Sequence, residues 1–408
     1  MELINEDIKM KLFCSKETWE RGIEHGLNKR LQVPLLSAVS SPYGRALIVQ
    51  AIEEKRYKIA PPTITEVPKA NGKIREVFCN EPMDRLVLNM INDVYYQLYK
   101  SKIHPNCVAY QKGLGVSKII RRVVDRLECG YCGYKVDLTK YFDNVNKETL
   151  FKTLDELSTD SPLDKVVKDY YYDDTVVIKG KMVERYKSLA QGCSLGTLLA
   201  NLVLADIDEL MSSFDIVYFR YSDDLLLIGK DADIALEVLE KELSLKGLSL
   251  NPSKIEKIDK DSEFTFLGCK VHGKEIDISD DSVKRYKDKI REITKMRKGM
   301  KVKNRGTQRK AIKEINYYLY EAFLKSSQNF GWMCYFGSIC TTNKTMIMLD
   351  EFTKDRVKSM YTGKFNHTTN MHKTSNEQLK ELGYKSLNHM YSLYKIDKDV
   401  FNAEIRKV

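Results

Sequence analysis

Two neighbouring aspartates interrupt the most apolar stretch of this 408-residue chain, and they constrain its fold more than any other feature. Apolar residues of 216–221 precede Asp223 and Asp224, and those of 225–229 follow them. Both flanks are typical of buried strands, so the segment predicts a hairpin with two acids at its tip. Carboxylates placed there repel each other and are costly to desolvate. Either this is ordinary turn chemistry, or a divalent cation with a preference for hard oxygen ligands holds the pair.

A third carboxylate stands at the end of another short apolar strand. Asp137 follows residues 134–136, and a strand ending there can bring it to the tip of the hairpin. Phosphoryl transfer with two metal ions needs carboxylates from more than one strand. One ion lowers the pKa of the attacking hydroxyl, and the other stabilises the leaving pyrophosphate. The three acids together favour a metal site over a turn residue and a strand cap.

Positive charge is concentrated in one segment. The net charge is +10, and residues Lys284 to Lys310 hold thirteen basic residues against two acids, an excess of eleven. Such a stripe indicates a polyanion as partner, although a solvated helix face has the same composition.

The remaining composition is that of an ordinary globular protein, with 43% apolar and 30% charged residues. No apolar run is long enough to span a membrane, and the first residues lack the core of a signal peptide. Nine scattered cysteines favour reduced thiols, so we expect a cytosolic protein that binds no membrane. Cys129 and Cys132 have metal-ligand spacing, but without a second pair we interpret them as two thiols beside a strand.

The periodicity of the chain predicts an α+β core with helical parts at both ends. Helices are expected at 17–32, 42–55, 84–102, 195–210 and 234–246, a hairpin around Asn71-Gly72, a strand at 264–271, and basic helices from about 282.

Several segments resemble the motifs of reverse transcriptases. Residues 135–143 and 221–224 are similar to motifs A and C, and motif C of that family reads Tyr-x-Asp-Asp. Residues 69–77 resemble the hairpin of the fingers, 190–201 motif B, 250–254 motif D and 264–269 motif E. The resemblance implies a right-hand polymerase with an antiparallel palm sheet. Its expected parts are a helical extension at 1–60, fingers and palm at 61–275, and a basic helical thumb at 276–408.

The resemblance also implies roles for single residues. Two Mg²⁺ ions, which Mn²⁺ could replace, would be held by Asp137, Leu138, Asp223 and Asp224, and Lys254 would protonate the pyrophosphate. The expected nucleotide-binding residues are Lys73, Arg75, Phe142, Gln191, Gly192 and Tyr221. The expected nucleic-acid contacts are Phe266, Leu267, Gly268, Lys284, Arg285, Arg291, Arg297, Lys298, Lys301, Lys303 and Arg305.

Phe142 would act as a steric gate against the 2′-hydroxyl of a ribonucleotide, whereas the alternative for this residue is core packing. The sequence departs from the family at motif B, where Ala190 replaces the usual Pro and Gly196-Thr197 replaces Ser-Pro. We therefore expect a more mobile loop there, with consequences for processivity and fidelity.

Among the branches of the family, the chain looks most like the stand-alone bacterial enzymes of the "unknown group", which defend against phage. It lacks the Val-Thr-Gly signature of retron enzymes after motif E, and residues 330–336 resemble a segment of group II intron enzymes. The resemblance implies a structured non-coding RNA as template, dNTPs as substrates and cDNA as product. Alternatives are untemplated or protein-primed DNA synthesis, a retron-like or group II intron-like enzyme, and a non-catalytic RNA-binding scaffold.

Overall fold

The computed structural model describes residues 7–28, 33–68, 74–111, 116–295, 304–321, 331–363 and 374–406. The chain forms two compact units: Met1–Gln111 with Gly133–Lys257, and Lys112–Cys132 with Ile258–Val408. These units are compact bodies rather than the functional parts expected above, whose boundaries stay a prediction.

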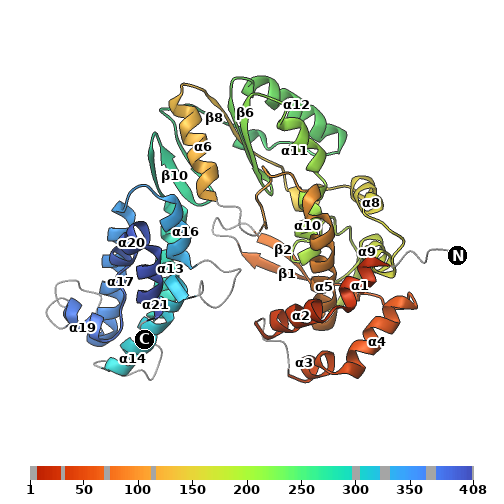
Figure 1. Ribbon diagram of the computed structural model, residues 1–408, viewed down its shortest axis with the longest axis horizontal. Coiled ribbons are helices and arrows are strands. Elements are labelled where there is room, and N and C mark those ends of the chain that lie inside the picture. The colour runs from red at the N-terminus through yellow and green to blue at the C-terminus, as the bar shows by residue number, and fades with distance from the viewer. Residues whose placement is uncertain are drawn as a thin grey trace. The chain divides into compact units, whose positions relative to one another are not determined.

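Four helices open the first unit (Figure 1), namely α1 (Ile8–Cys14), α2 (Lys16–Asn28), α3 (Val33–Ser40) and α4 (Pro42–Glu53). Of these, α1 and α2 pack against the long helix α5 (Pro82–Tyr99), which the 3-10 turn η1 (Lys100–Lys102) extends. Both α1 and α4 also contact α9 (Pro162–Tyr172). Helices α1, α2 and α4 are thus packed onto the core of this unit.

A buried ion pair fastens α1 to this core. The side chain of Lys9 is fully buried, pairs with Asp164 of α9 and donates to the carbonyl oxygen of Leu157 at 2.7 Å. The Tyr95 hydroxyl of α5 also donates to Asp164. A buried charge needs such partners, because its desolvation costs several kcal/mol, of the order of ~5.

The first unit also contains two sheets. One has the order β2-β1-β4-β5, built from β1 (Thr63–Pro68), β2 (Ile74–Cys79), β4 (Thr175–Ile178) and β5 (Lys181–Glu184). The antiparallel pair β1–β2 is the hairpin predicted from the sequence, although its turn at 69–73 lies outside the described residues.

The second sheet has the order β6-β7-β3-β8 and carries the predicted acids. Its strands are β3 (Gly133–Asp137), β6 (Ile216–Tyr221), β7 (Asp224–Gly229) and β8 (Glu256–Ile258), and β7 pairs antiparallel with both β6 and β3. Helices α11 (Ala205–Met211) and α12 (Ala232–Leu245) lie along this sheet, as Figure 1 shows. Four residues of β7, Leu225 to Ile228, are buried, as the apolar run predicted.

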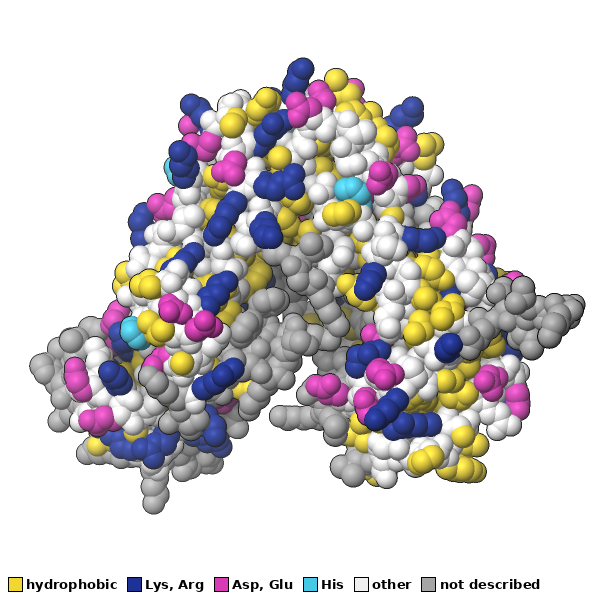
Figure 2. Space-filling model, in the orientation of Figure 1, with side chains coloured by type: hydrophobic (Ala, Val, Ile, Leu, Met, Phe, Trp, Pro, Cys, Tyr) yellow, Lys and Arg dark blue, Asp and Glu magenta, His cyan; other side chains and the backbone are white. Residues whose placement is uncertain are grey.

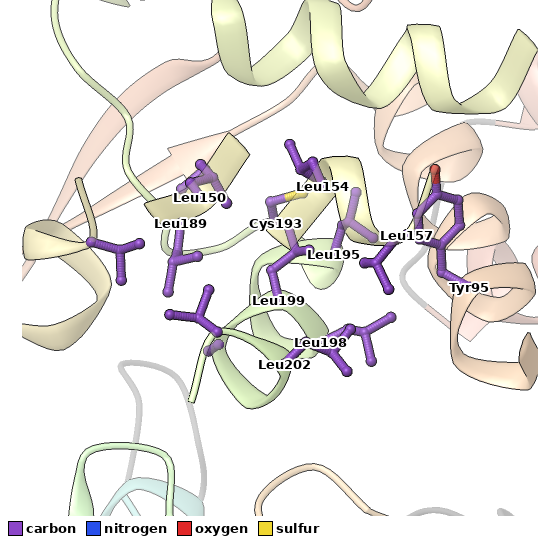
Figure 3. Close-up of a cluster of buried hydrophobic side chains, with 14 of the residues drawn as sticks. Tyr95, Leu150, Leu154, Leu157, Leu189, Cys193, Leu195, Leu198, Leu199 and Leu202 are labelled. Atoms are coloured by element: carbon purple, nitrogen blue, oxygen red, sulfur yellow. The ribbon is translucent and has the colours of Figure 1, made fainter. Parts of the chain in front are cut away.

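Helix α10 (Ser194–Leu202) supplies the centre of the core. Leu195, Leu198 and Leu199 are buried in one cluster with Leu150 and Leu154 of α8 (Lys147–Glu156), as Figure 3 shows. Short elements complete the unit: α7 (Tyr141–Asn144) and the 3-10 turn η2 (Pro252–Lys254).

The prediction of one helix over 195–210 was wrong, because the chain breaks between α10 and α11. The carbonyl oxygens of Ala200 and Asn201, which would accept bonds in a continuing helix, accept from side chains instead. The Tyr141 hydroxyl donates to Ala200 at 2.6 Å, and Arg220 donates to Asn201 at 3.0 Å. Side chains that satisfy the last carbonyls of a helix end it there.

The second unit begins with α6 (Val116–Glu128) and continues with the sheet β11-β10-β9, from β9 (Glu263–Phe266), β10 (Cys269–His272) and β11 (Glu275–Ile278). The strand predicted at 264–271 is therefore a hairpin. Leu267 and Gly268 form its turn with φ of +49° and +80°, values typical of two-residue hairpin loops.

Helices make up the rest of this unit: α13 (Asp280–Ile293), α14 (Arg305–Asn316), a π-helical turn η3 (Tyr317–Glu321), α16 (Trp332–Ile339), α17 (Lys344–Thr362), α19 (Asn376–Glu381), α20 (Leu387–Ile396) and α21 (Lys398–Arg406). Within the described ranges, every helix is too short or too polar to cross a bilayer. All nine cysteines are described, and each is free.

We predict that Lys9→Ala destabilises the protein by about 3–5 kcal/mol, because it leaves the Asp164 carboxylate buried without its cation. Chemical denaturation measures the change. The control is Lys16→Ala, which removes an exposed ion pair with Glu20 at 3.7 Å and should cost less than about 1 kcal/mol. Equal losses in the two variants would contradict the assigned role of Lys9.

Candidate active site

Strand register places two of the three predicted acids side by side. Asp137, the last residue of β3, faces Asp224, the first residue of β7, in the antiparallel ladder. Directly opposed residues of an antiparallel pair project from the same face of the sheet. The two carboxylates therefore leave the sheet together at one end.

Asp223 joins them from the turn between β6 and β7. Its carbonyl oxygen accepts from the Leu138 amide at 2.9 Å, which ties the turn to the residue after β3. The preceding residue, Ser222, has a φ of +61°, a left-handed conformation that is strained for a residue with a Cβ. Leu138 thus supports the turn through its amide, and its predicted metal contact stays a prediction.

Burial and neighbouring charge raise the pKa values of Asp223 and Asp224. Burial raises the pKa of Asp224 to about 6, and the charges of Asp223 and Asp137 add to this effect. Burial and Asp137 also raise the pKa of Asp223, while Lys254 and Arg75 act in the opposite direction. The arrangement favours protons or another cation beside the carboxylates.

Lys254 provides one positive charge at this place. Its Nζ lies 2.6 Å from Oδ2 of Asp137, and its side chain is 55% exposed. The Asp137 carbonyl oxygen accepts from the Asn251 amide at 2.8 Å, which fixes the segment carrying Lys254 against the end of β3. Lys254, the predicted proton donor, thus lies beside the three aspartates, and in this arrangement it forms an ion pair with Asp137.

A divalent cation fits the donor set, because three neighbouring carboxylates, two of which have raised pKa values, offer hard oxygen ligands and unbalanced charge. Within the described ranges, no group of three or more His, Cys, Asp or Glu side chains is already arranged as a set of ligands. Asp137 is turned toward Lys254 here, so its carboxylate would have to turn toward the other two to hold an ion in common.

The loop before α10 docks on the strand that carries Arg75. The Phe78 amide of β2 donates to the Gln191 carbonyl at 2.7 Å. Gly192 has a φ of +112°, and a Cβ there would lie 2.6 Å from Cγ1 of Val77. Glycine is therefore required by both conformation and space. Gln191 and Arg75 are held on adjoining segments, and Arg75 is close enough to lower the pKa of Asp223.

Ala190 explains the departure of this loop from the family pattern. Its φ is +50°, which a proline ring cannot adopt because the ring fixes φ near −65°. Ala190 is fully buried, and its amide donates to Lys187 at 2.8 Å. The loop is thus packed and hydrogen-bonded, which does not support the expectation of a looser segment.

Phe142 combines the two interpretations considered for it. Its ring is half-buried and packs edge-on against Tyr141, with centroids 6.0 Å apart. Its carbonyl oxygen accepts from the Leu189 amide at 3.2 Å, so it is joined to the loop before α10. A packed but only half-buried ring is compatible with a steric gate.

The structure adds Tyr110, to which the sequence gave no role in the site. Its ring lies 6.1 Å from that of Tyr221, and the side chain hydrogen-bonds to Ser222. The Asn201 amide of α10 donates to the carbonyl oxygen of Ala109 at 2.8 Å and holds this segment. Tyr110 has a φ of +58°, an uncommon conformation for a residue other than glycine.

Other predicted contacts belong to the second unit. The side chain of Phe266 is only 2% exposed, so a contact through its ring is excluded, whereas the carbonyl oxygen of Leu267 accepts from the Tyr335 hydroxyl. On α13, Lys284, Arg285 and Arg291 are exposed. Gly268 is half-buried and approaches Ser282 closely.

Arg305, at the start of α14, stacks on the Tyr361 ring at 3.9 Å. On the face visible in Figure 2, Lys and Arg side chains are interspersed with Asp and Glu. Five predicted residues lie outside the described residues: Lys73, Arg297, Lys298, Lys301 and Lys303.

A comparison with known families matches residues 67–271, half of the chain, to the family described as reverse transcriptase (RNA-dependent DNA polymerase). The match covers every segment of the first unit that carries a predicted acid. Members of this family generally use divalent metal ions. The α+β polymerase fold expected from the motifs is thereby confirmed.

Individual relatives are distant. Retron Ec48 reverse transcriptase of Escherichia coli is 25% identical over 250 residues, which are 57% of this chain and 57% of that protein. Protein YkfC of Escherichia coli K12 is 24% identical over 265 residues, 53% of this chain and 68% of that protein. The chain thus spans little more than half of the retron enzyme. Apo telomerase of Candida tropicalis overlaps with a TM-score of 0.46 at 13% identity, over 85% of this chain and 68% of that chain, too loosely to support an argument.

We predict that Asp224→Asn stabilises the metal-free protein at pH 8. The raised pKa of Asp224 means that the native state disfavours its charge, so the penalty is absent below about pH 4 and grows as pH rises through about 6. The amide removes a penalty on the order of 2–3 kcal/mol.

Urea denaturation at pH 4, 6 and 8 in the presence of a chelator measures this difference. Asp155→Asn, at a side chain that is 66% exposed, is the control and should change little at any pH. An unchanged or lower stability of Asp224→Asn at pH 8 would mean that the three carboxylates do not strain the native state.

Proposed function

This chain belongs to the reverse transcriptase family, and we propose that it synthesises DNA on an RNA template by a mechanism that uses two divalent cations, with Mg²⁺ as the usual ion and Mn²⁺ as a substitute. The observation that carries the proposal is the pairing of Asp137 with Asp224 in the ladder, next to Asp223 in the turn. Three mutually repelling acids, one buried and two half-buried, cost stability, and a protein that only binds RNA has no physical need for them.

Each residue of the site has a distinct task in this proposal. Asp137, Asp223 and Asp224 would hold the cations, which when bound activate the primer hydroxyl and neutralise the charge on the phosphates. Arg75 attracts the triphosphate, and Phe142 packs against the position of the sugar. Nζ of Lys254 releases Asp137 and donates a proton to the leaving pyrophosphate.

We further propose that the template is a structured non-coding RNA and that the cDNA serves defence against phage in the bacterial cytosol. Support comes from the sequence, whose motifs resemble those of the stand-alone bacterial enzymes, and from the similarity to a retron reverse transcriptase. The class that copies its own RNA into repeated cDNA fits these features best.

The test of the catalytic proposal is Asp223→Ala combined with Asp224→Ala. On an RNA template with an annealed DNA primer, the wild type should incorporate dNTPs with Mg²⁺, and the variant should show no synthesis. RNA affinity should remain within about twofold, because backbone contacts by Lys and Arg supply most of it.

The matched control is Asp259→Ala with Asp261→Ala, two acids of an exposed turn, which should keep full activity. If the site variant lost RNA binding to the same extent as synthesis, the acids would be structural. If the wild type itself extended no primer, the proposed activity would be rejected.

A second prediction concerns the choice of sugar. Phe142→Ala should reduce the preference for dNTPs over rNTPs roughly tenfold, because a pocket that loses a packed side chain accepts the extra hydroxyl. Competition between dNTP and rNTP at one template position measures it. Phe151→Ala, at another half-buried ring of the same core, should lower stability but preserve the preference. Unchanged discrimination in Phe142→Ala would reject the gate.

A further inference from the structure

A buried arginine lies directly before the turn that carries the acids. Arg220 of β6 and Asp208 of α11 are both 0% exposed, and they form a two-pronged ion pair with Nε to Oδ1 at 2.7 Å and Nη2 to Oδ2 at 2.6 Å. The Tyr218 hydroxyl donates to the same carboxylate at 2.7 Å. A buried charge pair of this kind adds little net stability, so its presence calls for another reason.

The remaining donors of the guanidinium reach main-chain oxygens. Nη1 donates to Ser222 at 3.3 Å and to Ala200 at 3.4 Å, and Nη2 donates to Asn201 at 3.0 Å. With the two bonds to Asp208, each of the five N–H groups has an acceptor. Arg220 therefore joins three places: the end of α10, the start of α11 and the turn before Asp223.

The turn needs such support. Ser222 has a φ of +61°, which costs about 1 kcal/mol, and the acids Asp223 and Asp224 follow it directly, with Asp137 opposite Asp224 in the ladder. Strain of this kind persists only where surrounding structure holds it. The Leu138 amide donates to the carbonyl oxygen of Asp223, and Arg220 donates to the carbonyl oxygen of Ser222. Each of the two central residues of the turn is therefore hydrogen-bonded to a residue outside the turn.

The main chain of Arg220 extends the connection to Tyr110. The Arg220 amide donates to Asn106, and its carbonyl oxygen accepts from Val108, both at 2.9 Å. Asn201, whose carbonyl oxygen binds Arg220, donates its side-chain amide to Ala109. Arg220 thus hydrogen-bonds to the segment before Tyr110, to the end of α10 and to the acidic turn, and it fixes the positions of these three segments relative to one another.

We propose that Arg220, held in place by Asp208, is a positioning residue that keeps Asp223 and Asp224 in the geometry needed to hold cations. The inference rests on the proposed polymerase function, and it concerns how the site is built rather than which reaction it performs. Neither residue belongs to the predicted set of metal ligands, and both are shielded from substrate by burial.

Arg220→Lys is the most informative variant. Lysine keeps a positive charge beside Asp208 but has three donors in place of five and no planar fork, so the bond to Ser222 is lost. We expect kcat to fall about 10- to 100-fold, as for small displacements within an active site, and the Mg²⁺ concentration for half-maximal rate to rise several-fold. RNA affinity and the KM for dNTPs should change less than about threefold.

A second variant removes the charge pair without leaving one charge alone. Arg220→Met with Asp208→Asn keeps an acceptor for Tyr218 and should fold, because neutral replacements of buried pairs are often tolerated. It should show the same loss of kcat and the same higher Mg²⁺ requirement. Tyr218→Phe, which removes one hydroxyl, covers the case in which both fail to fold, and we expect about a two- to fivefold lower kcat with a higher Mg²⁺ requirement.

The matched control is the other buried pair of this unit, as Lys9→Met with Asp164→Asn. It should lower thermal stability while kcat and the Mg²⁺ requirement stay at wild-type values. The proposal is overturned if the folded Arg220 or Tyr218 variants retain the wild-type kcat and Mg²⁺ requirement, or match the control in losing stability alone. An inactive wild type would reject the polymerase proposal instead, so the two failures are distinguishable.

Discussion

Repulsion among Asp137, Asp223 and Asp224 is the constraint on which the first unit depends. The acids lie at the ends of apolar strands that are largely buried, so the protein has to supply rigid support and positive charge at one end of a sheet. The support comes from the ladder β6-β7-β3 and from the bonds to Leu138 and Arg220. The charge comes in part from Lys254, and the remainder is left for cations.

The same constraint explains why elements distant in sequence converge on the hairpin. The loop before α10 is bonded to β2, and the end of α10 is capped by Arg220 from the strand that leads to the acids. Arg75 on β2, the proposed contact of the triphosphate, and a carboxylate in the turn are therefore connected through packed and hydrogen-bonded segments. Precise positioning of this kind is what phosphoryl transfer requires from a protein.

Sequence alone could predict the parts of this site that depend on local pattern. Apolar flanks around Asp223 and Asp224 identify the hairpin, and the spacing of Asp137 identifies the strand that meets it. The break after Leu202 could not be predicted, because apolar periodicity continues across it. At Leu267-Gly268 the apolar alternation changes phase, from Phe264 and Phe266 to Cys269 and Val271, and the expected single strand overlooked this signal of a turn. The break depends on Arg220, whose partners come from three other segments.

Buried charges were missed for the same reason. Lys9 and Arg220 look like surface residues in a linear pattern, since lysine and arginine are rarely buried without partners. Their partners, Asp164 and Asp208, are identified only once the fold brings the helices together. The position of Tyr110 beside Tyr221 likewise depends on the pairing of residues 106–108 with β6, which the sequence does not show.

The most direct measurement is purification from the native host, sequencing of the nucleic acid that copurifies, and sequencing of what is made after dNTPs and Mg²⁺ are added. The account predicts one defined RNA and a DNA product complementary to part of it. A product with no complement in the bound RNA would contradict templated synthesis and favour untemplated or protein-primed addition. Bound RNA with no product under any supply of dNTPs and divalent cation would contradict the catalytic account itself.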